Sequence, residues 1–214
     1  MQEIDKNTHT VQNRAMTKKE EQIAAAAIAV FSRYGVKRTT MNDIAQEAGV
    51  VRQTLYNVFA NKDEVIHGTI LYYSERQRLK TLQEWQGVTT LAEKLDILFK
   101  NHVSTPWKDI KKFPDAEDLG SGFNAASQHA LDEAAVRIRG TLYDLFAPYR
   151  HALQGIGESP ETFGDFVEGA MRGVKYGCHS VDELTQRLTT LKSVVLKFVG
   201  YKPEPVPSEF VTAR

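Results

Sequence analysis

The stretch from Thr40 to Phe59, TMNDIAQEAGVVRQTLYNVF, decides how the first third of this chain folds. It opens with a Thr followed three residues later by Asp43, a capping-box pattern that satisfies free amide groups in a first helical turn. Gly49 separates two runs of helical apolar spacing, and glycine can take the left-handed conformation that a tight turn requires. The stretch therefore predicts a helix-turn-helix, with short helices over residues 40–48 and 52–59.

The second of these helices is expected to separate polar from apolar side chains at about 100° per residue. Its polar arc holds Arg52, Gln53, Thr54, Tyr56 and Asn57. Its apolar arc, which includes Val51 and Leu55, is expected to pack on a stripe of the first predicted helix (17–34), formed by Ile23, Ala27, Val30, Phe31 and Tyr34. Side chains of these polar types can hydrogen-bond base edges or phosphates. The alternative is a solvated face, but such faces usually carry Lys and Glu, and this one has neither.

Helix-start signals continue along the chain and predict an all-α protein. Further helices are expected over residues 17–34, 62–86, 90–103, 106–112, 122–154 with a break at Pro148, 160–178 and 181–199. Thr105-Pro106 and Ser159-Pro160 are read as a cap followed by a first-turn proline. The predicted organisation is a polar arm (1–16), a helix-turn-helix domain (17–62), a second helical domain (63–201) and an extended, proline-containing tail (202–214).

Charge and composition restrict the partners. The 214 residues include 27 Lys and Arg and 27 Asp and Glu, so the net charge is zero, which argues against coating nucleic acid by bulk attraction. Between Arg33 and Lys62, however, five basic residues face two acidic ones, and Arg38 and Lys62 flank predicted helices where phosphates can be held. The single Cys178, together with the lack of an apolar leader or membrane-length run, predicts a cytoplasmic protein.

The segment YGVKRTTMNDIAQEAGV (34–50), with the later Thr54-Leu55-Tyr56, Phe59 and Lys62-Asp63-Glu64, resembles the tetracycline-repressor (TetR) family of bacterial regulators over about residues 17–66. The resemblance implies a three-helix DNA-binding domain followed by a helical domain for ligand binding and dimerisation. By position it implies phosphate contacts for Thr40, Tyr56 and Lys62, and base contacts for Arg52, Gln53 and Asn57.

Two positions depart from that family's pattern. Val51 stands where many members have Ser, which removes a helix cap at a cost of about 1 kcal/mol. We expect packing of Val51 on the apolar arc to compensate in part. Gln53 replaces a small residue, which changes how closely the backbone can approach DNA, and a gained base contact is the compensating hypothesis.

The last two predicted helices carry features of helix-on-helix packing. A seam at 3-4 spacing includes Leu184, Leu188, Leu191 and Val195, and the preceding helix places Gly169, Gly173 and Gly177 four residues apart. Each helical glycine costs roughly 0.5–1 kcal/mol relative to Ala, which close approach of another helix can offset. That helix could belong to the same chain; the resemblance favours a homodimer, whose two recognition helices would meet a pseudo-palindromic operator.

The middle of the chain offers candidates for the wall of an effector pocket: Phe99, His102, Trp107, Phe123, Asn124 and Ser127. His129, Asp132 and Glu133 have metal-capable spacing, but such sets are common on exposed helices, so neither a metal nor a cofactor is predicted. P-loop, GxGxxG, HExxH and GxSxG patterns are missing, which disfavours an enzyme. We expect a repressor released by a small molecule; the alternative is the same fold controlled by a protein partner or by no ligand.

Overall fold

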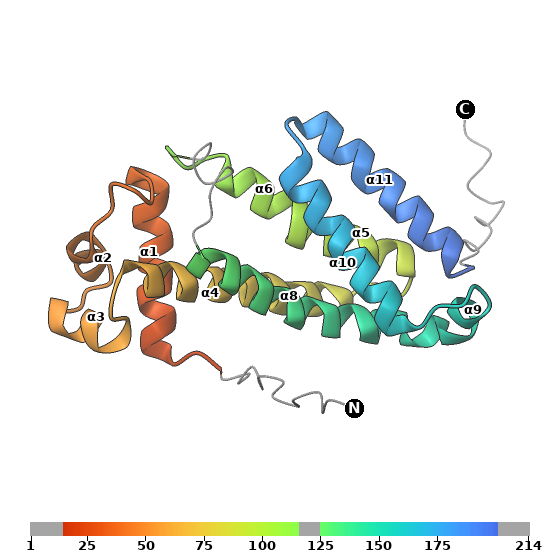
Figure 1. The fold of residues 1–214 in the computed structure, drawn as a ribbon, viewed down its shortest axis with the longest axis horizontal. Coiled ribbons are helices and arrows are strands. Elements are labelled where there is room, and N and C mark those ends of the chain that lie inside the picture. Colours follow the sequence, from red (N-terminus) through yellow and green to blue (C-terminus); the bar gives the residue numbers. More distant parts are fainter. Residues whose placement is uncertain (1–14, 116–124, 201–214) are drawn as a thin grey trace, which may run out of the picture. The chain divides into compact units, whose positions relative to one another are not determined.

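The computed structural model describes residues 15–115 and 125–200. Within these ranges every regular element is a helix, which confirms the predicted all-α class (Figure 1). Most of the predicted arm (1–16), the tail (202–214) and the pocket candidates Phe123 and Asn124 lie outside the described residues.

The helices follow the predicted order closely. They are α1 (Lys18–Tyr34), α2 (Met41–Glu47), α3 (Arg52–Val58), α4 (Lys62–Trp85), α5 (Leu91–Phe99), the π-helix η1 (Lys100–Ser104), α6 (Thr105–Ile110), α8 (Ala125–Phe146), the 3-10 helix η2 (Ala147–Tyr149), α9 (Arg150–Gln154), α10 (Pro160–Gly177) and α11 (Val181–Phe198). Capping boxes form at Thr17, Thr40, Thr90 and Ser159. The predicted break at Pro148 is also confirmed, because η2 separates α8 from α9 there.

The segment before Pro106 differs from the prediction. A helix start capped by Thr105 was expected, but the chain passes from α5 through η1 into α6 without interruption. The backbone N–H of Thr105 donates to the carbonyl of Lys100, five residues earlier. Proline has no N–H, so the carbonyl of His102 would lose its α-helical partner at position 106. The wider π-turn is where the helix accommodates this loss.

By compactness the chain forms two units, each assembled from two stretches of sequence. The first unit comprises Met1–Glu75 and Lys111–Val136, and the second comprises Arg76–Ile110 and Arg137–Arg214. Helices α4 and α8 therefore each contribute residues to both units. The predicted domain boundary between residues 62 and 63 stays a prediction.

Each unit has its own apolar core. In the first unit, buried residues of α1, α2 and α3 come together, among them Ile23, Phe31, Ile44 and Leu55. In the second unit the core joins α5, α8, α10 and α11. Among the described residues, no helix combines the length and the apolar character needed to cross a membrane.

Candidate nucleic-acid interface

The turn between α2 and α3 has the geometry that the sequence predicts. Gly49 has φ +64°, the left-handed conformation. Its N–H donates to the Gln46 carbonyl (3.1 Å), and the N–H of Val50 donates to the Ala45 carbonyl (3.0 Å). These two bonds form a Schellman motif, which ends α2 and redirects the chain into α3. Gln22 of α1 donates to the Ala48 carbonyl (2.7 Å) and so ties the turn to the first helix.

Packing beneath the turn confirms most of the predicted apolar stripe. Ile23, Ala27, Val30 and Phe31 are buried, whereas Tyr34 is 53% exposed. The expectation that Tyr34 belongs to the core is therefore wrong. Tyr34 is the last residue of α1, next to the C-cap Gly35, and this final turn extends past the stripe that packs on α2 and α3.

The polar arc of α3 is accessible and already organised. Arg52, Gln53 and Asn57 are exposed, Thr54 and Tyr56 are half-buried. The Arg52 guanidinium donates to the Tyr56 hydroxyl (3.3 Å) and lies 5.3 Å from its ring centre. The Gln53 amide donates to Asn57 Oδ1 (2.9 Å). These i,i+4 pairs hold the side chains along one face, while Arg52 keeps further N–H donors for other partners.

The start of α3 lacks a side-chain cap, as the sequence predicts, but the expected compensation by packing is wrong. Val51 is the N-cap residue, forms no capping bond and is 69% exposed. An N-cap residue has extended rather than helical backbone, here φ −72° and ψ 149°, so a helical wheel does not place its side chain.

Of the predicted DNA-contacting residues near α2, Arg38 is available for a partner, whereas Thr40 and Lys62 form hydrogen bonds within the protein. Arg38 is exposed and has no hydrogen-bond or ion-pair partner among the described residues. The Thr40 hydroxyl donates to the Asp43 carboxylate (2.8 Å) and accepts the Asp43 N–H (3.3 Å). Bonds donated by the Thr40 backbone and hydroxyl lower the pKa of Asp43, which keeps this cap charged.

Lys62 is engaged inside the protein. Its ammonium donates to the carbonyls of Val36 (2.9 Å), Lys37 (3.3 Å) and Thr39 (3.1 Å), so its three donors hold the loop before α2. A phosphate contact through this ammonium would require one of these bonds to be given up. Arg33 forms an ion pair with Glu47, which further reduces the positive charge available near α3.

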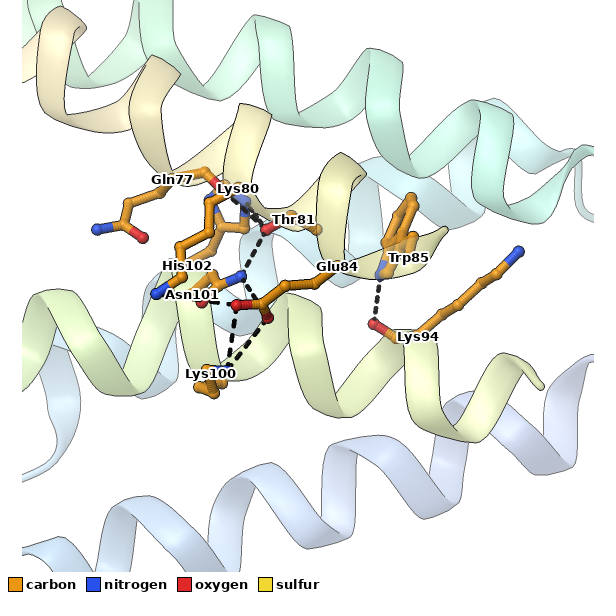
Figure 2. A network of polar contacts seen from close by, with 9 residues as sticks. All are labelled: Gln77, Lys80, Thr81, Glu84, Trp85, Lys94, Lys100, Asn101 and His102. Atoms are coloured by element: carbon orange, nitrogen blue, oxygen red, sulfur yellow. Dashed lines mark hydrogen bonds and ion pairs between the residues drawn. The ribbon is translucent and has the colours of Figure 1, made fainter. Parts of the chain in front are cut away.

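A second candidate site lies in the other unit, where polar side chains are buried together (Figure 2). Thr81 and Asn101 are fully buried and His102 is 8% exposed. Asn101 Nδ2 donates to Thr81 Oγ1 (3.1 Å) and to Glu84 Oε2 (3.3 Å), and Lys100 donates to the same carboxylate oxygen (3.1 Å).

The network fixes the protonation of His102. The Thr81 hydroxyl donates a hydrogen bond to the Gln77 carbonyl (2.9 Å), so towards His102 Nε2, at 3.2 Å, its oxygen is the acceptor. Burial lowers the pKa of His102 to about 3, and the positive charges of Lys175 and Arg78 act in the same direction. His102 is thus a neutral, Nε2-protonated imidazole. Asn101 Oδ1 is buried with no partner among the described residues.

The predicted pocket residues are distributed between the two units. Phe99 is buried and His102 nearly so, and both lie in the second unit with Trp107, whose Nε1 donates to the Cys178 carbonyl (3.1 Å). Ser127 is buried in the first unit. Sequence reasoning missed Thr81 and Asn101. The signal for Asn101 is the polar pair Asn101-His102, which separates the apolar residues 97–99 from Val103.

The predicted dimer residues separate into two sets. Leu184, Leu188, Leu191 and Val195 are at most 8% exposed and pack in the core of their own chain, so their predicted role in a dimer interface stays a prediction. Gly169 and Gly173 are exposed, and a Cβ added at either would meet nothing within 4 Å. At Gly177 it would lie 3.3 Å from the Arg187 guanidinium.

Apolar and small residues surround these glycines on α10 and α11. On α10, Phe166 (55% exposed) and Tyr176 (41%) continue the line of Gly169 and Gly173 at helical spacing. On α11, Thr185, Thr189 and Ser193 are exposed, and each hydroxyl donates to the carbonyl four residues earlier. We call these seven residues the α10–α11 face. The three hydroxyls on α11 already donate within their own helix, so covering them leaves none of these three donors unsatisfied.

A helix-turn-helix with an exposed polar recognition face, followed by a larger all-helical region, defines a class of DNA-binding regulator. Residues 23–68 match the sequence model described as "Bacterial regulatory proteins, tetR family". The helix-turn-helix region is therefore similar to that family of bacterial regulators.

Three relatives illustrate the extent of the similarity. The chain is 40% identical over 50 residues to the probable acrEF/envCD operon repressor of Escherichia coli K12, which is 23% of each chain. It shares its fold with the fatty acid degradation regulator FadR from Bacillus halodurans (TM-score 0.60, 19% identity, 86% of this chain and 97% of that one). FadR from Bacillus subtilis in complex with stearoyl-CoA is similar in fold (TM-score 0.55, 18% identity, 85% and 98%). The alignments span at most 40% of the first curated relatives.

Proposed function

We propose that this chain is a transcriptional regulator, a homodimeric repressor that binds a pseudo-palindromic operator in the cytoplasm and releases it when a small-molecule effector binds the helical domain. The observation that carries the proposal is the face of α3, where Arg52, Gln53 and Asn57 are exposed together immediately after the Schellman turn. These are the side chains that read purines in the major groove by paired hydrogen bonds. The proposal describes binding rather than catalysis.

Phosphate contacts are assigned to residues around this face. Arg38 is an exposed cation beside α2 with no partner among the described residues, and Thr54 and Tyr56 supply hydroxyls that can reach the backbone of the duplex. Thr40 would contact a phosphate by turning its hydroxyl away from Asp43, to which it donates its one proton. Lys62 would contribute indirectly, because its ammonium holds the loop that carries Arg38. A zero net charge then fits binding by a few placed contacts.

Replacing Arg52 tests the recognition face directly. Operator fragments selected from random oligonucleotides serve as the DNA, and fluorescence anisotropy gives the Kd. Arg52→Ala is expected to weaken operator binding by about 5- to 150-fold, corresponding to about 1–3 kcal/mol for a base-reading arginine. Arg150→Ala removes the same charge from an exposed position in α9 and is expected to leave the Kd unchanged. Equal Kd values for both variants would overturn the assignment of α3.

The α10–α11 face is assigned to the dimer contact. A bulky side chain at Gly173 would hold two copies of this face apart, so Gly173→Leu is expected to shift sedimentation towards the monomer. Gly140, in the middle of α8, is equally exposed and equally free of neighbours within 4 Å, which makes Gly140→Leu a matched control for the helix-propensity change. A dimer that withstands Gly173→Leu would exclude this face.

The buried network around Asn101 is assigned to the effector side. An unpartnered amide oxygen beside a neutral imidazole can accept one hydrogen bond from a ligand and donate none in return. The effector should bind best to the form whose two recognition helices do not fit successive major grooves, and this difference in affinity sets the loss of DNA binding. A metabolite screen for operator release tests it; tight operator binding that no metabolite alters would favour control by a protein partner or by no ligand.

A further inference from the structure

In the first unit, α4 and α8 bring together three side chains that the recognition face does not use. His67 lies on α4, and His129 and Glu133 lie one turn apart on α8. One ligand atom from each residue lies within 4.8 Å of the other two. From these positions we infer that His67, His129 and Glu133 form a binding site for a transition-metal dication of the zinc class.

The distances suit a small metal ion. His67 Nε2 and Glu133 Oε2 are 3.5 Å apart. Bonds of about 2.0–2.2 Å in tetrahedral geometry place neighbouring ligand atoms roughly 3.3 Å from one another. The pair is thus already spaced for a shared ion, and a ligand atom of His129 lies within 4.8 Å of both, so it would have to move closer to bind the same ion. Three protein ligands would leave the fourth position of a tetrahedral ion to water.

The ring arrangement favours the same conclusion. The imidazoles of His67 and His129 stack with centroids 5.6 Å apart and planes 22° from parallel. Two protonated imidazoles would repel one another in this arrangement, whereas two neutral ones can turn a nitrogen each towards one cation. Two imidazoles with one carboxylate select zinc, cobalt or nickel over magnesium and calcium, which prefer oxygen ligands alone.

The α4 side of the site is held firmly. Next to His67, Gly68 packs on Phe59 at the end of α3, where an added Cβ would lie 2.7 Å from the ring. This contact fixes the turn of α4 that carries His67. Glu133 is also partly enclosed, with 14% of its side chain exposed. Asp132, which the sequence analysis grouped with His129 and Glu133, is not in the cluster, and His67 takes its place.

Zinc binding to the untagged, metal-stripped full chain tests the inference without any DNA. Calorimetric titration with zinc chloride is expected to give one site per chain, and cobalt is expected to give the visible absorption bands of a low-symmetry site. His129→Ala and Glu133→Gln should each weaken zinc binding at least about 10-fold, the effect already typical of disturbing an outer shell. His151→Ala removes an exposed imidazole elsewhere and should bind as the parent chain does.

The inference would be overturned by a parent chain that binds no zinc, or by a His129→Ala variant with unchanged affinity. His67→Phe gives an independent check, with circular dichroism used to confirm its helix content. Magnesium in excess should not compete, since it prefers oxygen ligands, and effective competition by magnesium would likewise contradict a zinc-class site.

Discussion

The two polar sites of this molecule place similar side chains in opposite environments, one exposed to solvent and one buried. On α3, amide and guanidinium groups are exposed and paired with neighbours one turn away in the same helix. In the network of the second unit, amide, hydroxyl and imidazole groups are buried and bonded across 20 or 21 residues of sequence (Figure 2). The exposed pairs can therefore exchange partners at little cost in free energy, whereas the buried groups contribute to the stability of the fold.

Lowering the pH should reveal the difference between the buried and the exposed site most strongly, because the buried site contains His102. The folded-state pKa of His102, about 3, lies below the unfolded value of 6.5, so the unfolded chain binds more protons between these values. The free energy of unfolding should therefore fall as the pH drops through this window, by up to about 1.4 kcal/mol per pH unit, or about 3 kcal/mol between pH 6.5 and 4.

Urea denaturation at several pH values measures this loss. In His102→Gln, an amide N–H can still donate to Thr81 but does not titrate. The free energy of unfolding of this variant should therefore depend less on pH, and the difference from the parent chain is the contribution of His102. Carboxylates titrate in both proteins and cancel in the difference. Identical pH profiles for the two proteins would show that His102 is not buried as a neutral group.

Truncating the buried amide of Asn101 should lower the free energy of unfolding by less than the protonation of His102 does, but by more than any substitution on α3. Asn101→Ala removes two donated bonds and leaves a small cavity, so the free energy of unfolding is expected to fall by about 2 kcal/mol. The double variant Gln53→Ala, Asn57→Ala removes an exposed pair and should stay within about 0.5 kcal/mol of the parent chain. If the exposed double variant lost as much stability as Asn101→Ala, the contrast between the two sites would fail.

The smallest expected effect is a gain at the start of α3. Val51→Ser supplies the hydroxyl cap that this helix lacks and removes an exposed valine, which should stabilise the chain by about 1 kcal/mol. Thermal unfolding would then shift upward by about 2–4 °C. Val51→Ala, which cannot cap, serves as the control; a similar shift in both variants would mean that removing the valine, not adding a cap, is responsible.

How far the sequence predicts the structure follows from how local each feature is. The Schellman turn at Gly49, the caps and the polar arc of α3 depend on residues within one or two turns, and the sequence predicts them. Val51 shows the limit of a helical wheel, which does not apply to an N-cap residue.

The network and the metal cluster depend on tertiary contacts. Asn101, which lies in the π-helix η1, meets Thr81 across 20 residues, and His67 meets His129 across more than sixty. Likewise, the seam at Leu184 and Leu188 has the spacing of a helix interface, but spacing alone does not say whether the facing helix belongs to the same chain or to a partner.

The i,i+4 pairs on α3 have a consequence for how such a protein would search DNA. If the chain binds an operator as proposed, Gln53 would stay bonded to Asn57 and Arg52 to Tyr56 on any other DNA, because base edges that form weaker hydrogen bonds would not displace these partners. Sliding along unrelated sequence would then be governed by phosphate contacts alone and stay fast. Sliding would stop only at a base sequence whose hydrogen bonds replace those between Gln53 and Asn57 and between Arg52 and Tyr56. The same pairs would then determine both how fast the protein slides and how selectively it binds.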